Sequence, residues 1–173
     1  MSNVRVKKRN GSIEPMNLEK MHVMVERACS DLAGVSASQV EMQSGIQFYN
    51  GITTDEIQGI LIKSASDLIS LEQPNYQYVA ARLLLFSLRK SLYGKIYEIP
   101  HLKDHIDKCV ENGVYDPAVN DKFTVGEINE LEKYLDHDRD YLFTYAGLRQ
   151  VADKYLVQDL SLIHISEPTR LGA

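Results

Sequence analysis

Residues 6–20 read VKKRNGSIEPMNLEK and carry, in order, a turn signal, a strand end and a helix start. The Asn-Gly pair in the centre is the strongest two-residue hairpin signal, because both central positions of a type I′ turn need a positive φ. Pro15 ends the second strand, and Asn17 is a good N-cap for a helix that begins at Leu18. The stretch therefore predicts a β-hairpin over residues 4–15 with a helix directly behind it.

Four helices are predicted in the first unit of the chain. The helix behind the hairpin carries apolar residues every 3.6 positions, which is the helical period. Ser36 and Gln39 have the spacing of a capping box and start a second helix that runs to about Phe48. The third helix opens at residues 53–56, and the fourth starts at Pro74 and ends before Gly94. The first unit is thus a small hairpin plus about four helices.

A second helical unit is predicted beyond Pro100. It begins with one helix and continues through an irregular stretch around Pro117 to a short helix capped by Thr124. A last helix is expected from about Tyr141 to Leu156. The sequence shows no internal repeat, and its fold class is predicted to be mainly α.

The bulk composition is that of an ordinary globular chain. It has 173 residues, 44% of them hydrophobic and 25% charged, and a net charge of −5, which argues against a general nucleic-acid binder. No run approaches the ~20 apolar residues that a membrane span needs, and the N-terminus lacks an apolar signal core. The expectation is a cytoplasmic protein without nucleic-acid or membrane partners. Cys29 and Cys109 have no metal-type spacing and are expected to be buried free thiols.

The charge is unevenly spread along the chain. Residues 1–20 carry five bases against two acids, whereas residues 98–140 carry twelve acids against five bases. Side chains alternate along a strand, so Lys8 could turn inward, while Lys20 and Lys90 come from predicted helices. Together these lysines could converge on phosphate groups, with Arg9 assisting from the turn.

Two further residues fit a nucleoside triphosphate. Thr54 lies at a predicted helix N-terminus, where a hydroxyl, free N–H groups and the helix dipole all favour an anion. Glu14 could accept a hydrogen bond from the exocyclic amine of adenine. The alternative is that an edge strand carries Lys and Arg only to deter aggregation, and spacing alone favours that interpretation.

Other candidate sites are weaker. Asp136, Asp138 and Asp140 have the spacing of a calcium loop, but neither the required Gly nor the closing Glu follows, so a helix N-terminus rich in acids is the better interpretation. His101 and His105 stand four apart, yet no carboxylate or cysteine completes a metal set. The chain has no phosphate-loop motif, no dinucleotide fingerprint and no supported nucleophile. Nucleotide binding without chemistry indicates a sensor.

The order of motifs along the chain resembles a known family. The hairpin pattern Val-x-Lys-Arg-x-Gly-x-x-Glu-x-x-Asn-x-x-Lys is followed by Ile46-Gln47-Phe48-Tyr49, Gly51-Ile52, Thr54, Tyr76-Gln77-Tyr78, His137-Asp138-Arg139-Asp140 and Lys154-Tyr155-Leu156-Val157-Gln158. This set resembles an ATP-cone. More narrowly, it is similar to the N-terminus of the large (alpha, catalytic) subunit of class I ribonucleoside-diphosphate reductase, over residues 4–159.

The resemblance implies an overall-activity switch. In the family, ATP in the cone permits reduction of ribonucleotides and dATP stops it, commonly by changing how subunits assemble; Mg²⁺ is expected with the triphosphate. Carried over by position, the nucleotide contacts are Lys8, Arg9, Glu14, Pro15, Met16, Asn17, Leu18, Glu19, Lys20, Thr54 and Lys90. Gln58 occupies a position where some relatives have a histidine. Because Gln cannot become cationic, the phosphate affinity or the ATP/dATP balance is expected to differ.

The resemblance also implies the domain organisation. Residues 1–95 would be the ATP-cone and residues 96–159 the first helices of the reductase's N-terminal helical domain, without the catalytic barrel. The fragment alone is therefore expected to be inactive. In the whole parent protein the partners would be the radical-generating small (beta) subunit and other large subunits.

Residues 160–173 look foreign to the family. The run from Leu160 to Arg170 reads as the translation of a transposase-end sequencing adapter, so we expect an artefact of read-through. Two alternatives to the reductase interpretation stay open. One is the cone of a nucleotide-sensing transcriptional repressor, which would carry a four-cysteine zinc ribbon in front. The other is a helical interaction module that binds no nucleotide.

Overall fold

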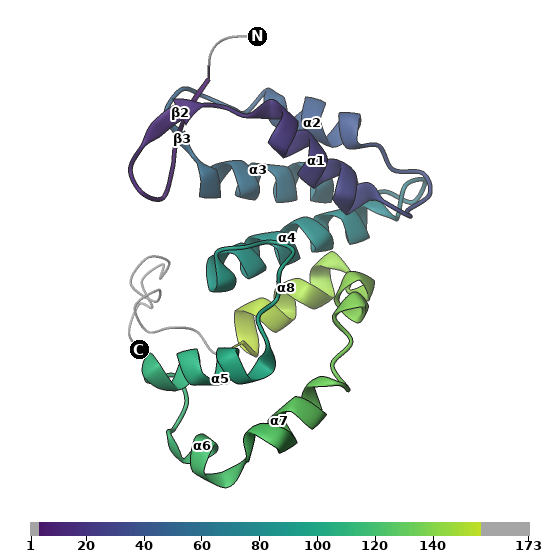
Figure 1. Ribbon diagram of the computed structural model, residues 1–173. Coiled ribbons are helices and arrows are strands. Elements are labelled where there is room, and N and C mark those ends of the chain that lie inside the picture. Colours follow the sequence, from purple (N-terminus) through teal and green to yellow (C-terminus); the bar gives the residue numbers. More distant parts are fainter. Residues whose placement is uncertain (1–3, 157–173) are drawn as a thin grey trace, which may run out of the picture. The chain divides into compact units, whose positions relative to one another are not determined.

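The computed structural model describes residues 4–156 and is mainly helical, with a small sheet near its N-terminus (Figure 1). Within this range the chain forms two compact units, residues 4–99 with 137–149 and residues 100–136 with 150–156. A compact unit need not be a domain, so the bounds 1–95 and 96–159 stay predictions. The tail interpreted as adapter read-through, residues 160–173, lies outside the described residues.

The predicted hairpin is confirmed. Strands β1 (Arg5–Lys7) and β2 (Ile13–Pro15) pair antiparallel, with Val6 opposite Glu14. A third strand, β3 (Ile52–Thr53), pairs in parallel with β1, which gives the order β2-β1-β3. Two residues are too few to show a strand pattern, so β3 could not be predicted from the sequence.

The type I′ turn predicted for this hairpin is wrong. Among the described residues Asp31 is the only non-glycine with a positive φ, whereas Gly11 has φ 84°, so Asn10 does not adopt the required conformation. The Gly11 N–H instead donates to the Lys8 carbonyl at 2.9 Å, and the Lys8 N–H donates to the Ser12 carbonyl at 2.8 Å. This pattern is typical of a three-residue loop closed by a left-handed glycine.

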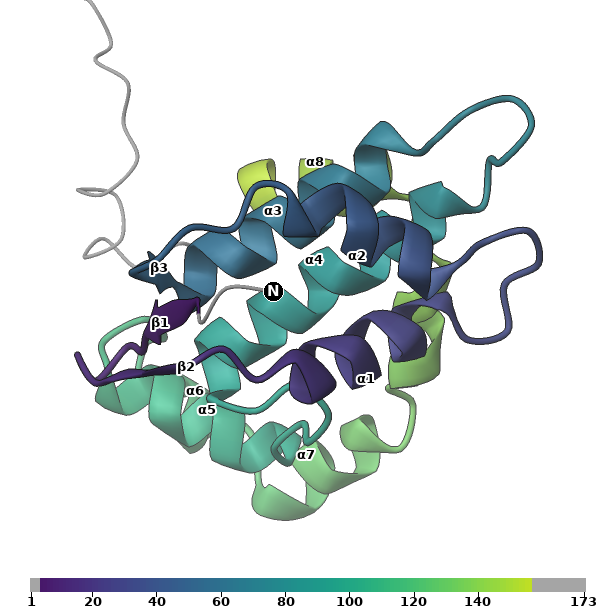
Figure 2. The same cartoon turned by 90° about the horizontal axis from the view of Figure 1, so that it is seen from above.

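Four helices follow the hairpin within residues 4–99, as predicted: α1 (Leu18–Cys29), α2 (Ala37–Gly45), α3 (Thr54–Asp67) and α4 (Tyr76–Tyr93). Helix α4 packs against α1 and α3, and Figure 2 shows it running between them. The fully buried side chains that join these helices include Val25, Val40, Leu61, Val79 and Phe86. The hairpin and the start of α3 are thereby held at one edge of the helical core.

Both ends of α2 differ from the prediction. Ser36 makes no side-chain cap, and its N–H donates to the phenol oxygen of buried Tyr76 at 2.9 Å. The Tyr76 hydroxyl in turn donates to the side chain of Gln39, the residue expected to close the capping box. The helix ends at Gly45 rather than near Phe48. A buried phenol must find hydrogen-bond partners, and here it uses the groups that a local cap would have used.

The second unit contains α5 (Leu102–Glu111), α6 (Ala118–Lys122) and α7 (Val125–Glu132). Helices α5 and α7 pack together, and Thr124 forms the predicted cap of α7 as a full capping box with Glu127. Helix α6 lies in the stretch expected to be irregular. No helix among the described residues is long and apolar enough to cross a membrane.

The predicted last helix starts later than expected. A 3₁₀ turn, η1 (His137–Leu142), precedes α8 (Tyr145–Lys154). Asp140 does not head the α-helix; its carboxylate accepts from the guanidinium of Arg89 at 2.8 Å, and Arg89 is only 6% exposed. Asp138 and Asp140 thus lie in the first turn of a 3₁₀ helix rather than at the start of the predicted α-helix, and Asp140 also neutralises a buried cation on α4.

Candidate functional site

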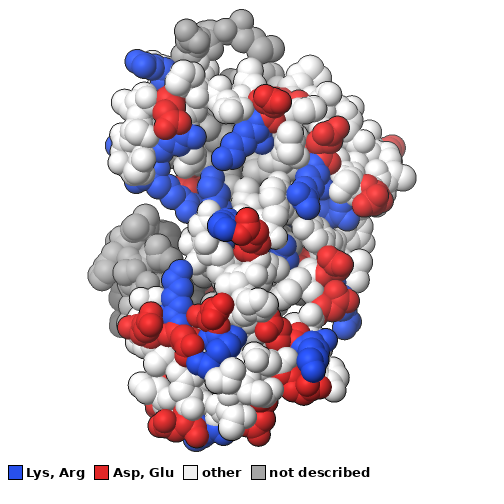
Figure 3. Space-filling model, in the orientation of Figure 1, with Lys and Arg blue, Asp and Glu red and all other residues white. Residues whose placement is uncertain are grey.

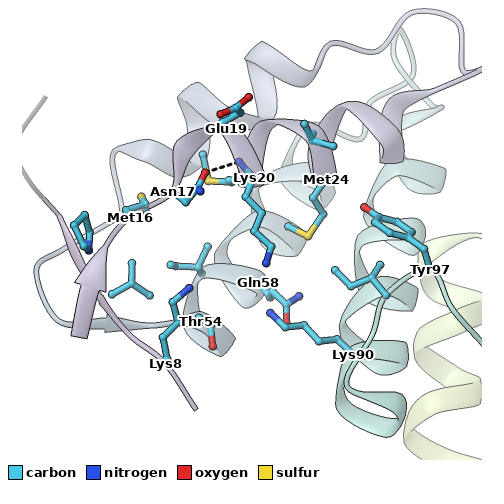
Figure 4. A pocket seen from close by; sticks show the side chains of 16 residues that line it. Lys8, Met16, Asn17, Glu19, Lys20, Met24, Thr54, Gln58, Lys90 and Tyr97 are labelled. Atoms are coloured by element: carbon cyan, nitrogen blue, oxygen red, sulfur yellow. Dashed lines mark hydrogen bonds between the residues drawn. The ribbon is translucent and has the colours of Figure 1, made fainter. Parts of the chain in front are cut away.

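A cavity of about 430 Å³ opens between the hairpin, α1, α3 and the end of α4 (Figure 4). All its lining residues belong to the first unit. They are Val6, Lys8, Pro15, Met16, Asn17, Glu19, Lys20, Met21, Val23, Met24, Thr54, Ile57, Gln58, Lys90, Ile96 and Tyr97.

Three lysines from three elements meet in this cavity. Lys8 follows β1, Lys20 lies in the first turn of α1 and Lys90 lies in the last turn of α4, and their side chains extend toward the same space (Figure 4). Desolvation lowers the pKa of Lys90, and the positive charges of Arg9, Lys20 and Lys8 lower it further. An anion placed among such crowded positive charges would offset their mutual repulsion and favour their protonated forms.

The distribution of surface charge agrees with a basic cavity in the first unit. Lys and Arg side chains gather on the part of the first unit that carries the hairpin, whereas acidic side chains are frequent over the second unit (Figure 3). Lys8 has an acidic partner, since its Nζ lies 3.6 Å from the Glu14 carboxylate. That pair is partly exposed to solvent and therefore weak.

Helix α3 adds polar groups to the same cavity. Thr53 is its N-cap, so Thr54 is the first helical residue and lies beside the free N–H groups of the helix start. One turn later Gln58 lines the cavity and is 5% exposed. Its amide oxygen lies 3.4 Å from the Ser87 hydroxyl, which donates to it. The helix thus offers a hydroxyl and an amide, but no charge, to a ligand.

Asn17 has two roles at this site. Its side-chain oxygen accepts from the Lys20 N–H at 2.8 Å, which confirms the predicted N-cap of α1. The amide nitrogen keeps its two N–H donors, and the residue lines the cavity. The same side chain therefore fixes the start of α1 and presents a directional polar group to a ligand.

Nine of the twelve residues predicted to contact nucleotide line the cavity, and three do not. Arg9 donates to Asp55 and to the Lys90 carbonyl. Glu14 lies next to Lys8 and accepts from the Ser12 hydroxyl at 3.3 Å. Leu18 faces a different hollow. A nucleotide contact at each of the twelve positions stays a prediction.

Several cavity residues were not predicted from the sequence. They are Val6, Met21, Val23, Met24, Ile57, Ile96 and Tyr97. Helical spacing from Lys20 to Met24 and from Thr54 to Ile57 could have indicated some of them. Nothing local could have indicated Ile96 and Tyr97, because they return to the cavity only after the left-handed turn at Gly94.

A second hollow of about 680 Å³ lies between the start of α1 and α2. It is larger, but its lining is mostly apolar and includes Leu18, Met42, Ile46 and Phe48, with Glu41 as its one charged residue. An anionic ligand would meet no cation there. The smaller, basic cavity is therefore the candidate site.

The residues considered for metal or thiol chemistry lie elsewhere. His101 pairs with Glu132 at 3.1 Å, and the ring of His105 lies 3.6 Å from the sulfur of Cys109. Among the described residues no group of three His, Cys, Asp or Glu could hold a metal ion. Both cysteines are free but only half-buried, less than predicted, and burial raises the pKa of the Cys29 thiol to about 11. A thiol with that pKa is a poor nucleophile.

Comparisons with known proteins agree with this geometry. Ribonucleoside-diphosphate reductase 1 subunit alpha of Escherichia coli (strain K12) is 48% identical over 157 residues, which are 91% of this chain and 20% of that protein. The reductase subunit alpha of Haemophilus influenzae is 47% identical over 89% of this chain and 20% of its own length. The reductase subunit alpha of Enterobacteria phage T4 is 47% identical over 136 residues, which are 78% of this chain and 18% of that protein. The chain thus spans about a fifth of the length of these relatives.

The model of one family, the ATP cone domain, matches residues 4–91. This range contains the hairpin, helices α1 to α3, most of α4 and the three cavity lysines. It therefore includes all the lining residues of the basic cavity except Ile96 and Tyr97, and the chain belongs to the ATP-cone family.

Proposed function

We propose that the basic cavity binds a nucleoside triphosphate, ATP or dATP, as an allosteric effector. The observation that carries this proposal is the convergence of Lys8, Lys20 and Lys90 from three separate elements beside the N-terminus of α3. Three cations and a helix start match the charge of a triphosphate. The match of the ATP cone domain to residues 4–91 supports the same ligand class.

The polar groups of the cavity suggest an orientation for the ligand. The phosphates would lie among the lysines and Thr54, where positive charge is concentrated. The base would lie toward Pro15, Met16 and Asn17, where an apolar surface adjoins an amide. Glu14 would have to turn inward from Lys8 to reach the adenine amine. Bound Mg²⁺ would neutralise part of the phosphate charge.

We further propose that this site governs a larger enzyme. The reductase alpha subunits that resemble the chain are more than four times its length, so the chain would be their regulatory portion. ATP would permit and dATP would stop ribonucleotide reduction in the cytoplasm, through contacts with the small beta subunit and other alpha subunits. The 173 residues alone would bind nucleotide without reducing a substrate.

Calorimetry on the full 173-residue chain tests the binding proposal. ATP and dATP should each give saturable heat, and Lys8→Ala or Lys90→Ala should weaken binding at least about tenfold, since each removes a charge-assisted contact. Lys7→Ala is the matched control, because Lys7 directly precedes Lys8 at the end of β1 but lies outside the cavity lining. It should leave the affinity within about twofold.

An independent measurement uses thermal unfolding. A ligand present at 100 times its Kd should add about 2.7 kcal/mol of stability. If millimolar ATP and dATP gave neither heat nor a shift in unfolding temperature, the cavity would not be a nucleotide site. The chain would then be better described as a helical interaction module.

A further inference from the structure

Arg9 stands next to a cavity lysine but does not line the cavity. Its Nε and Nη2 donate to one carboxylate oxygen of Asp55 at 3.1 and 2.7 Å, and its Nη1 donates to the Lys90 carbonyl at 3.3 Å. All three guanidinium nitrogens therefore contact protein acceptors. These acceptors lie on α3 and α4, 46 and 81 residues away along the chain.

These contacts fix the tip of the hairpin on two helices. Asp55 is the second residue of α3, directly after Thr54, and Lys90 is itself a cavity lysine. Arg9 follows Lys8 in sequence, so its position limits where the Lys8 side chain can reach. A planar guanidinium holding three hydrogen bonds is a geometric constraint that a lysine could not provide.

We propose that Arg9 and Asp55 form a latch that positions Lys8 and Thr54 for the phosphates, with Arg9 acting as a positioning residue rather than a phosphate ligand. The inference rests on the proposed nucleotide site. It assigns a role to Asp55, which lies outside the cavity lining. It also explains why a site proposed for a highly charged anion has the Asp55 carboxylate on the first turn of α3. This carboxylate holds Arg9 in place.

The latch makes a prediction opposite to that of simple electrostatics. Asp55→Asn removes a negative charge close to the bound phosphates and frees a cation. If Arg9 were a phosphate ligand, this change should leave ATP binding unchanged or strengthen it. If the pair is a latch, the same change should weaken binding, because Lys8 and Thr54 would no longer be preorganised. The direction of the change therefore decides between the two roles.

The experiment is calorimetry with Mg²⁺-ATP on the full 173-residue chain. Asp55→Asn should raise the Kd about two- to fivefold, the range expected when an exposed pair contributes up to 1 kcal/mol. Asp55→Glu, which keeps the carboxylate, should restore most of the affinity. The matched control is Asp67→Asn at the other end of α3, where the acid pairs with Lys63 at 3.1 Å; this variant should bind like the wild type.

A double-mutant cycle completes the test. Arg9→Ala should weaken binding in the wild-type background but change little further in the Asp55→Asn background. Unchanged or tighter binding by Asp55→Asn would overturn the latch, as would equal losses from Arg9→Ala in both backgrounds. A wild type that binds no ATP would instead overturn the nucleotide site, and the latch with it. Unfolding midpoints of the unliganded variants confirm that each is folded.

Discussion

Lys90 is a cavity lysine whose ionisation depends on its surroundings. Its pKa lies below the usual 10.5 because of desolvation and the nearby Arg9, Lys20 and Lys8. A bound triphosphate would favour the protonated form, so binding should take up protons as the pH approaches the lowered pKa. We therefore expect the affinity for ATP to fall as the pH rises through a window that begins below 10.5.

Calorimetry in buffers of different ionisation enthalpy measures this proton uptake directly. Lys90→Arg is the control, because an arginine stays protonated throughout the window. The variant should bind ATP with a much flatter pH dependence than the wild type. An identical pH dependence in both proteins would show that Lys90 is not the titrating group.

Among the single elements, helix α3 has its start stabilised by a capping box between Thr53 and Glu56. Thr53 Oγ1 accepts from the Glu56 N–H at 3.2 Å, and the Glu56 carboxylate accepts from the Thr53 N–H at 2.8 Å. Hydrogen bonds from Thr53 and Tyr49 lower the pKa of that carboxyl. Thr53→Ala should lower the free energy of unfolding by about 1 kcal/mol, measured by urea denaturation. Thr53→Ser, which keeps the hydroxyl, should lose far less.

Helices α1 and α2 are joined by a pH-dependent pair. His22 Nδ1 lies 2.8 Å from the Glu41 carboxylate, and the hydrogen bond and charge of Glu41 raise the pKa of His22 above 6.5. A raised folded-state pKa means that the pair stabilises the fold fully below 6.5. This stabilisation is lost as the pH rises through the folded-state value.

The expected outcome is a stability difference between wild type and His22→Gln that depends on pH. Urea midpoints should differ most at about pH 5 to 6, where the histidine is charged, and converge at alkaline pH. Glu41→Gln should abolish the same pH dependence. A constant difference across the series would assign the effect to packing instead of charge.

At the scale of the whole molecule, the cavity depends on the core that joins the helices. Leu61 on α3 is fully buried among residues of helices α1, α2, α3 and α4. Leu61→Ala should lower the free energy of unfolding by about 2–5 kcal/mol, measured by urea denaturation. Leu71→Ala is the matched control, because Leu71 is 97% exposed and should change stability little. Similar losses in both variants would contradict the described core.

Much of the first unit could be predicted from short stretches of sequence. The hairpin, the Asn17 cap and the four helices are all set by contacts between residues close in sequence. The cap predicted at Ser36 was wrong where a distant group competed with such a contact, whereas the predicted type I′ turn was wrong although all its contacts are local. Ser36 makes no side-chain cap, and its N–H donates to Tyr76, which is 40 residues away. The contact of Asp140 with Arg89, 51 residues away, could likewise not be predicted from local sequence.

The sequence by itself determined the hairpin, the four helices of residues 18–93 and the residue types that they offer to a ligand. A hairpin turn or an N-cap is satisfied within a few residues, so its signal is local. Only the tertiary structure decided that β3 joins β1, that three lysines share one cavity and that Arg9 turns to Asp55. The physical reason is that long, flexible cationic side chains have no preferred partner along the chain. Packing of the helices fixes which acceptors and which charges come within their reach.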